Sequence, residues 1–200
     1  MSIPVILDTD IGTDVDDVWA LAFLLRCPEL DVRLITTSTG DTRHRAALVA
    51  KLLGVAGRED VPIGVGLALD PAPLGHTGWL GDYDLADYPG PVYTDGVGAI
   101  CDTIMNSTET VTVIAIGPLP NLAAALAREP RICERSRFVG MQGHARIQRQ
   151  AARVVMPGGL CRALAQDHHA VGYLRQHHAP GRAVCSGSAK HLAIDPSGTG

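Results

Sequence analysis

The chain has 200 residues, of which 46% are hydrophobic and 4% aromatic, and its formal net charge is -4. This length allows one domain with a sizeable core, and the mild negative charge gives no reason to expect nucleic acid or an anionic membrane as a partner. Its five cysteines include no CxxC pair, which argues against a disulfide framework or a zinc site.

Apolar periodicity predicts alternating strands and helices over most of the chain. The predicted strands, in chain order, are 5–7, 32–38, 61–65, 111–116 and 138–141. The predicted helices are 15–26, 42–53, 94–105 and 121–128, the second of which is expected to end at Gly54. Strands that alternate with helices imply right-handed βαβ units, and therefore an α/β fold with a Rossmann-like, mostly parallel sheet and flanking helices.

An acidic run directly follows the first predicted strand. It contains five carboxylates within ten residues, namely Asp8, Asp10, Asp14, Asp16 and Asp17. The next positively charged side chain along the chain is Arg26, so no basic neighbour in sequence neutralises them. A hard divalent cation bound by oxygen ligands would relieve their mutual repulsion. Simple N-capping is the structural alternative, because Asp16 and Asp17 fall in the first turn of the next helix.

Two further polar loops follow predicted strands, at residues 38–41 and 117–121. The carboxyl ends of parallel strands meet at one edge of the sheet, where ligands of such sheets bind. We therefore expect these loops and the acidic run to converge. Asp41 could instead cap the helix that follows it, and we interpret Asn121 as a helix cap rather than a ligand.

Three segments carry a family resemblance. VILDTDIGTDVDDVWAL, LITTSTGDTRHRAALVAKLL and VTVIAIGPLPNLAAAL, in this order, resemble the inosine-uridine-preferring nucleoside hydrolases over residues 3 to about 143. The resemblance implies a calcium-dependent enzyme that cleaves the N-glycosidic bond of a ribonucleoside to give ribose and free base. The usual family pattern D-x-D-x-G-x-D-D is two residues longer here, D-x-D-x-G-x-D-x-D-D. We match Asp8 and Asp10 before the insertion, and Asp16 and Asp17 after it.

The resemblance also implies roles in the acidic run. Asp10 would bind calcium and act as the base that takes a proton from the attacking water, and Asp17 would be a second metal ligand. Asp8 and Asp14 are further candidate ligands, and Asp14 has no clear family counterpart. Asp16 would hold ribose hydroxyls. The chemistry agrees, because loss of a base from ribose develops positive charge on the sugar, which nearby carboxylates stabilise.

Three residues outside the run receive roles in the same way. Asp41 stands where the family often has an Asn near the metal, and we expect it to contact substrate. Pro120 replaces a Thr whose backbone carbonyl binds calcium, and proline keeps that carbonyl. His76, in GHTGWLG, resembles a family loop near the nucleobase, although an ordinary loop histidine is the alternative reading.

The composition changes near Gly143. Residues 1–143 carry a charge balance of -9 and residues 144–200 one of +5, and six of the eight histidines lie in the second segment. The family's later Glu-x-Asn segment and later metal-binding Asp have no counterpart here. We therefore predict a nucleoside hydrolase-like α/β domain over 1–143 and an atypical tail over 144–200, translated out of frame or disordered, with the C-terminal part of the family fold missing or altered.

Other functions fit less well. An EF-hand loop counted from Asp8 would need Gly and Glu where Thr13 and Trp19 stand. A phosphatase of the haloacid dehalogenase type, whose first strand also ends in D-x-D, would have a threonine where Gly12 stands. A catalytically inactive, truncated remnant of the nucleoside hydrolase family is the main alternative.

Partners and location follow from the same features. The expected partner is a small-molecule nucleoside, and the family's dimers and tetramers imply a homo-oligomer. The longest unbroken apolar run, residues 18–25, is too short to span a bilayer. The N-terminus shows neither the basic region nor the cleavage pattern of a secretory signal, so we predict a cytoplasmic protein without membrane contact.

Overall fold

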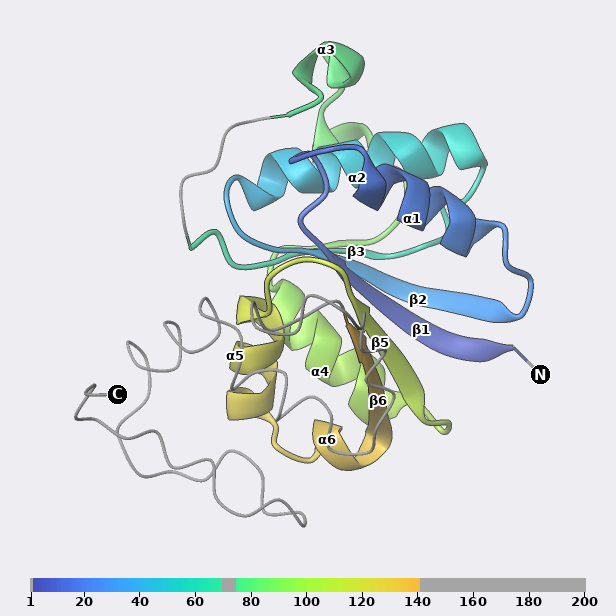
Figure 1. The fold of residues 1–200 in the computed structure, drawn as a ribbon, viewed down its shortest axis with the longest axis vertical. Helices are drawn as coiled ribbons and strands as arrows, with labels where there is room; N and C mark the ends of the chain where they lie inside the picture. Colours follow the sequence, from blue (N-terminus) through green and yellow to red (C-terminus); the bar gives the residue numbers. More distant parts are fainter. Residues whose placement is uncertain (1, 70–74, 141–200) are drawn as a thin grey trace, which may run out of the picture.

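The computed structural model describes residues 2–69 and 75–140. The atypical tail predicted over residues 144–200 lies outside the described residues, as does its boundary near Gly143. Within the described part, the chain forms a six-stranded parallel sheet with helices on both faces (Figure 1). The predicted α/β class is therefore confirmed.

The elements follow one another as strand–helix units. The strands are β1 (Ile3–Thr9), β2 (Leu30–Thr37), β3 (Ile63–Val65), β4 (Val92–Tyr93), β5 (Val111–Ala115) and β6 (Ser136–Gly140). The helices are α1 (Asp16–Leu25), α2 (Thr42–Ala56), α3 (Thr77–Leu80), α4 (Gly96–Asn106), α5 (Pro120–Arg128) and α6 (Ile132–Arg135), with the 3-10 turn η1 (Leu85–Asp87). Every predicted strand and helix forms. The short elements β4, α3, η1 and α6 were not predicted, because two to four residues are too few to show a periodicity.

Helix α2 corrects one predicted boundary. Gly54 was expected to end this helix, but the helix continues to Ala56. Gly57 follows in the left-handed conformation with φ of 66°, and its N–H bonds back to the last turn. Glycine adopts this conformation without a Cβ clash, so the second of the two glycines ends the helix.

The strand order places a reversal beside β1. The order across the sheet is β4-β3-β2-β1-β5-β6, so the chain builds outward from β1 on one side and then returns to β5 on the other. In the register of β1 and β5, Asp8 lies opposite Ala115, close to the carboxyl ends of both strands. Loops diverge to opposite faces at such a switch point, and ligands of parallel α/β sheets bind there.

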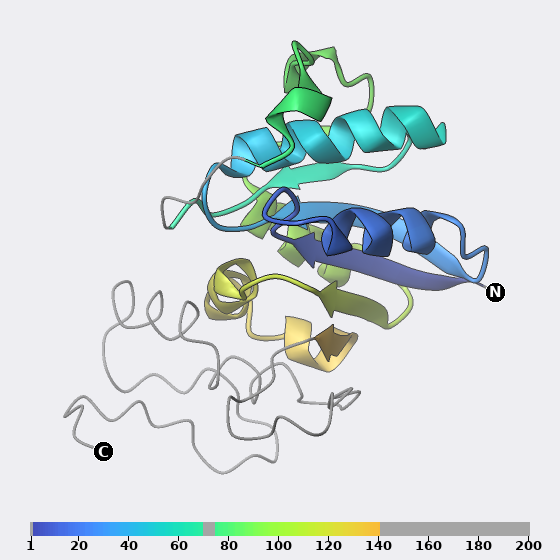
Figure 2. The ribbon, with the colours of Figure 1, turned by 45° about the horizontal axis from the view of Figure 1, so that its top comes forward.

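Alternate side chains of β1 enter two separate cores. Val5 and Leu7 pack under the layer of α1 and α2, whereas Ile6 packs on the opposite face with α4 and α5. Figure 2 shows these two helical layers on either side of the sheet. A strand buried on both faces is apolar at every position, which explains the unbroken apolar stretch before the acidic run.

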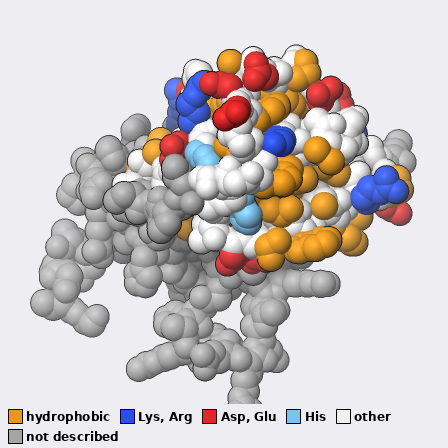
Figure 3. Space-filling view, turned by 90° about the horizontal axis from the view of Figure 1, so that it is seen from above, with side chains coloured by type: hydrophobic (Ala, Val, Ile, Leu, Met, Phe, Trp, Pro, Cys, Tyr) orange, Lys and Arg blue, Asp and Glu red, His pale blue; other side chains and the backbone are white. Residues whose placement is uncertain are grey.

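The outer surface of the α1–α2 layer is partly apolar. Trp19, Phe23 and Val55 are exposed, and Figure 3, which looks onto the top of the molecule, shows hydrophobic side chains among charged ones there. Trp79 of α3 lies under the Lys51 ammonium group, 5.0 Å from the ring centroid. Among the described helices, none combines the length and the apolar character that crossing a bilayer requires.

Candidate functional site

The acidic run forms the end of β1, the β1–α1 loop and the first turn of α1. Asp8 is fully buried in β1, and Asp10 is partly exposed just beyond it. Asp14 and Asp16 are exposed, and Asp17 is buried in the first turn of α1. The five carboxylates that are adjacent in sequence therefore occupy three different environments.

Asp17 is the most perturbed carboxyl group of the loop. Burial, followed by the negative charges of Asp10, Asp16 and Asp14 in that order of effect, raises the pKa of Asp17 to about 7. A hydrogen bond with Thr9 opposes the shift. The repulsion expected from the sequence therefore acts on Asp17, whose charged form is disfavoured in the absence of a cation.

Asp14 and Asp16 form an exposed pair. The hydrogen bond between their side chains raises the pKa of Asp14 and lowers that of Asp16. Asp16 Oδ1 also accepts a hydrogen bond from the Asp17 backbone N–H at 3.0 Å. These two carboxylates are therefore open to solvent and to a ligand, while Asp17 lies behind them.

The loop after β5 reaches the acidic loop. A methyl group placed on Gly117 would lie 2.5 Å from Asp10 Oδ1 and 2.8 Å from the Asp10 backbone nitrogen. Ser38, in the loop after β2, donates a hydrogen bond from Oγ to the Pro118 carbonyl at 3.3 Å. The three polar loops therefore meet at one edge of the sheet, as the sequence predicted.

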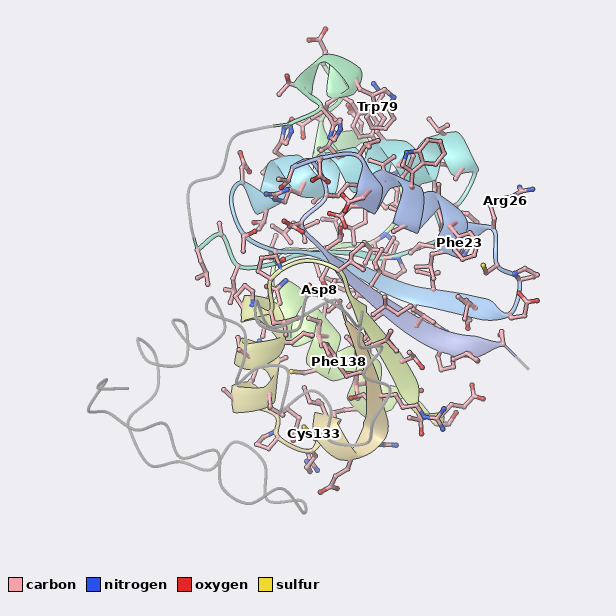
Figure 4. The ribbon with its side chains drawn as sticks, viewed as in Figure 1. Asp8, Phe23, Arg26, Trp79, Cys133 and Phe138 are labelled. Carbon is pink, nitrogen blue, oxygen red and sulfur yellow. The ribbon has the colours of Figure 1, made fainter. Side chains whose placement is uncertain are left out.

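Beneath the acidic loop, Asp8 belongs to a buried polar network. Its Oδ1 accepts hydrogen bonds from Thr36 Oγ1 at 2.6 Å and from Asn121 Nδ2 at 2.8 Å. Asn121 Nδ2 also donates to the Thr37 carbonyl at 2.9 Å, and its Oδ1 accepts from Leu67 N–H at 2.8 Å. Figure 4 shows Asp8 at the centre of the structure, between the two helical layers.

This network corrects the interpretation of Asn121. Helix α5 begins at Pro120 after Leu119, and no side chain caps it, so Asn121 is not its cap. Asn121 instead joins β1, β2 and the segment after β3, and its side chain is fully buried. Pro120, which occupies the first helical position, is also buried. A role for the Pro120 carbonyl toward calcium stays a prediction.

Asp41 is exposed and caps helix α2. Its Oδ1 accepts a hydrogen bond from the His44 backbone N–H at 2.9 Å. The capping alternative is thus present in the structure. Capping uses one oxygen of this carboxylate, and a contact of Asp41 with substrate stays a prediction.

The loop that contains His76 packs against the acidic loop. A methyl group on Gly75 would clash with the Gly12 carbonyl oxygen, and His44 Nε2 lies 2.9 Å from the Gly75 carbonyl. His76 itself has φ of 56° and a buried Nδ1 without a hydrogen-bond partner among the described atoms. The structure therefore brings His76 beside the acidic loop, and its contact with a nucleobase stays a prediction.

Arg45 is a residue of the site that the sequence reasoning missed. It lies on α2, is 4% exposed, and donates hydrogen bonds from Nη1 to the carbonyls of Asp10 and Ile11, the latter at 2.7 Å. Arg45, which is distant in sequence, therefore supplies the positive charge that the acidic run lacks among its sequence neighbours. One signal was available, because Arg45 is in phase with the apolar positions Leu48 and Val49 of its helix, and a charged residue on a buried stripe needs a partner.

The chemistry of these side chains fits a hard cation. Calcium prefers oxygen ligands, and the loop offers carboxylates whose mutual repulsion a cation would relieve. Among residues 2–69 and 75–140, no group of three or more His, Cys, Asp or Glu side chains is arranged to hold a metal ion. Asp10 and Asp17 are the pair best placed to contribute, since Asp10 has the largest charge effect on the Asp17 pKa.

Together, the fold and this edge define a doubly wound parallel α/β protein with an acidic loop at its switch point. The chain belongs to the inosine-uridine preferring nucleoside hydrolase family, whose sequence model matches residues 5–159. The resemblance inferred from the three segments is therefore confirmed.

Individual relatives agree with this assignment. The non-specific ribonucleoside hydrolase RihC of Klebsiella pneumoniae is 34% identical over 155 residues, and that of Salmonella agona is 36% identical over 154; each match covers 72% of this chain and 50% of the relative. The chain thus spans about half the length of these curated relatives.

Solved structures show the same fold. The plant nucleoside hydrolase PpNRh1 superposes with a TM-score of 0.64 at 26% identity, covering 87% of this chain and 57% of that one. The inosine-uridine preferring nucleoside hydrolase of Bacillus anthracis gives a TM-score of 0.60 at 21% identity, covering 70% and 51%. The second likeness concerns the fold alone.

Proposed function

We propose that this chain acts as a ribonucleoside hydrolase that cleaves the N-glycosidic bond to give ribose and a free base, with calcium as its metal. The observation that carries the proposal is the acidic loop at the switch point, where burial and three neighbouring carboxylates raise the pKa of Asp17 to about 7. Membership of the nucleoside hydrolase family supports the choice of reaction.

The proposed roles follow from the positions of the side chains. Asp10 and Asp17 would hold the calcium ion, with Asp8, Asp14 and the Pro120 carbonyl as further candidate ligands. When bound, calcium would lower the pKa of a water molecule that it coordinates. Asp10, partly exposed beside the Gly117 backbone, would accept the proton from the attacking water.

Substrate contacts are assigned to the exposed part of the same edge. Asp16 is exposed in the first turn of α1, and we propose that it holds the ribose hydroxyls together with Asp41. Binding of these hydroxyls would orient the sugar for attack. His76, on the loop that packs against Gly12, would lie beside the nucleobase. The negative charge of the loop would stabilise positive charge that develops on the ribose.

The test is release of free base from inosine and uridine by the full chain, with added calcium and with a chelator. We expect chelation to abolish turnover and calcium to restore it. Asp10→Asn should lower kcat by about 10²–10⁴-fold, because it removes the proton acceptor. Asp102→Asn, an exposed aspartate on α4, is the matched control and should behave like the wild type. Turnover that persists in chelator, or in Asp10→Asn, would contradict the proposal.

The inactive remnant named in the sequence analysis is the second candidate. A remnant and an enzyme differ in turnover but not in fold. Circular dichroism that shows a folded chain, combined with no release of base at saturating calcium, would support the remnant. Calcium binding measured by calorimetry would then show whether the acidic loop still takes up the metal.

Self-association is a further part of the proposal. The exposed apolar side chains Trp19, Phe23 and Val55 on the α1–α2 layer support it, because exposed apolar patches commonly mark protein interfaces. Light scattering coupled to size-exclusion chromatography tests it. A monomer at micromolar concentration would contradict this part while leaving the proposed reaction untouched.

A further inference from the structure

The acidic loop joins β1 to α1, and ordering such a loop costs conformational entropy that its contacts must offset. The contacts of Arg45 fall on this loop. Its Nη1 donates to the carbonyls of Asp10 and Ile11 and to Thr13 Oγ1, the last at 3.2 Å. Its Nε donates to the Thr39 carbonyl at 2.9 Å, so one side chain joins the loops after β1 and β2.

These contacts go to backbone carbonyls and to the Thr13 hydroxyl, and not to the carboxylates. Arg45 holds the main chain at Asp10 and Ile11, and no hydrogen bond from it to the Asp10 carboxylate is present. A guanidinium group has a rigid planar arrangement of donors, so it can fix several acceptors in one geometry. The carboxylates thereby keep their oxygens for a ligand while their backbone is held in place.

The anchor itself is rigid. Arg45 lies one turn from the start of α2, which Asp41 caps, and its side chain is 4% exposed. The loop also rests on the helix at Gly12, where a methyl group would lie 2.7 Å from Leu48 Cδ1 and 3.7 Å from Arg45 Nη1. Gly12 has φ of 102°, so the loop follows a path over α2 that other residues rarely adopt.

The charge of Arg45 also acts on the loop. Burial lowers the pKa of the Arg45 guanidinium, and the negative charges of Asp10, Asp17 and Asp41 oppose that shift. Arginine stays protonated in proteins, so a buried positive charge lies beside the acidic loop. This charge reduces the repulsion among the carboxylates without occupying them, which leaves room for a divalent cation.

We propose that Arg45 is a positioning residue of the nucleoside hydrolase site, which holds the β1–α1 loop so that Asp10 and Asp17 present their carboxylates together. It acts through the backbone of the loop and touches no reacting atom. The inference rests on the proposed function and deepens it, because it names the element that organises the calcium-binding carboxylates.

The test compares Arg45→Met and Arg45→Lys with Arg43→Met in the full chain. Arg43 is a matched control, because it lies on the same helix, is exposed, and forms an ion pair with Asp84 at 3.3 Å rather than with the acidic loop. Calcium affinity is measured by calorimetry, kcat and KM by release of base from inosine, and loop order by hydrogen exchange of the amides of residues 10–17.

We expect Arg45→Met to weaken calcium binding and to lower kcat/KM by about 10–100-fold each, as for other residues that orient metal ligands. Exchange should accelerate at residues 10–17 and stay unchanged in β5. Arg45→Lys should recover part of the calcium affinity, because it keeps the charge, but not the slow exchange, because one ammonium group cannot replace the planar donors. Arg43→Met should match the wild type.

Three outcomes would overturn the inference. Wild-type exchange at residues 10–17 in Arg45→Met would show that the loop does not depend on this side chain. Acceleration spread equally over the sheet would show a general structural role. If Arg45→Met does not fold, full recovery of slow exchange and of calcium affinity in Arg45→Lys would show that charge alone suffices. A wild type without turnover or calcium binding would contradict the proposed function, and the exchange experiment would still decide the role of Arg45.

Discussion

Two regions at the same edge of the sheet, the buried network around Asp8 and the acidic loop, place carboxylates in opposite environments. In the buried network, Asp8 Oδ1 accepts hydrogen bonds from the neutral donors Thr36 and Asn121. In the acidic loop, Asp10, Asp16 and Asp14 all raise the pKa of Asp17, and the buried Arg45 guanidinium donates hydrogen bonds to the backbone of the loop. The network joins strands and a helix, whereas the loop keeps its carboxylates available for a ligand.

The difference arises over two residues of chain. Asp8 lies in β1 and, because side chains alternate along a strand, points to the same face as Ile6, toward the layer of α4 and α5. Asn121 of α5 donates its hydrogen bond to Asp8 on that face. Asp10 lies past the end of the strand, where alternation no longer applies. Identical side chains therefore acquire a structural role or a candidate catalytic one according to where the strand ends.

The largest expected effect on stability tests the network. Asn121→Ala removes three buried hydrogen bonds, two donated by Nδ2 and one accepted by Oδ1. We expect the free energy of unfolding to fall by about 3 kcal/mol, because buried polar groups lose their partner. Urea denaturation measures it, with the exposed Asn106→Ala as control. A loss as small as that of the control would remove the distinction between the two regions.

The pH dependence of stability tests the loop. In chelator, Asp17 has a folded pKa of about 7 against an ordinary value of 3.8, so the folded state binds the extra proton between these values. Stability should therefore fall as pH rises from about 4 to about 7 and level off above. Asp17→Asn should flatten this slope in thermal unfolding, and Asp102→Asn should retain it. A wild type whose stability rises over this window would contradict the assignment.

A smaller effect tests the contact between the loops. Gly117→Ala would place a methyl group 2.5 Å from Asp10 Oδ1, so Asp10 must move. We expect kcat/KM for inosine to fall about tenfold, with a modest loss of stability from local overpacking. Gly78→Ala is the control, because a Cβ there has nothing within 4 Å. Unchanged kinetics in Gly117→Ala would show that the position of Asp10 tolerates this displacement.

The smallest effect separates two readings of Asp41. Asp41→Ala removes the side-chain cap of α2 and should lower the free energy of unfolding by about 1 kcal/mol. Asp41→Asn keeps the cap and should be as stable as the wild type. If Asp41→Asn nevertheless raises KM for nucleosides, Asp41 also contacts substrate; an unchanged KM would leave capping as its sole role.

Much of the fold could be predicted because its signals are local. The apolar stretch of β1 and the helical spacing of α1 identified both elements within two residues of their observed ends. The alternation of strands and helices then implied a parallel sheet, whose carboxyl edge collects the loops after β1, β2 and β5. Short elements such as β4 were not predicted, because two residues show no periodicity and depend on the neighbouring strand for their hydrogen bonds.

The residue types of the candidate site could be predicted from the sequence, but the contacts between its distant segments could not. Asp10 and Asp17 are proposed as ligands from the family resemblance, and that assignment stays a prediction. Arg45 and the true partners of Asn121 could not be predicted, because their contacts span 34 and 113 residues of sequence. Sequence patterns reflect neighbours along the chain, whereas these pairs come into contact only after the sheet has assembled.

The sequence by itself determined that five carboxylates cluster at the end of a buried strand and that this strand belongs to a parallel α/β sheet. Only the tertiary structure decided how those carboxylates divide, with Asp8 in a network of neutral donors and Asp17 buried beside like charges. The physical reason is that charge and hydrogen-bonding capacity are properties of residues, whereas desolvation and the identity of a partner depend on which segments folding brings together.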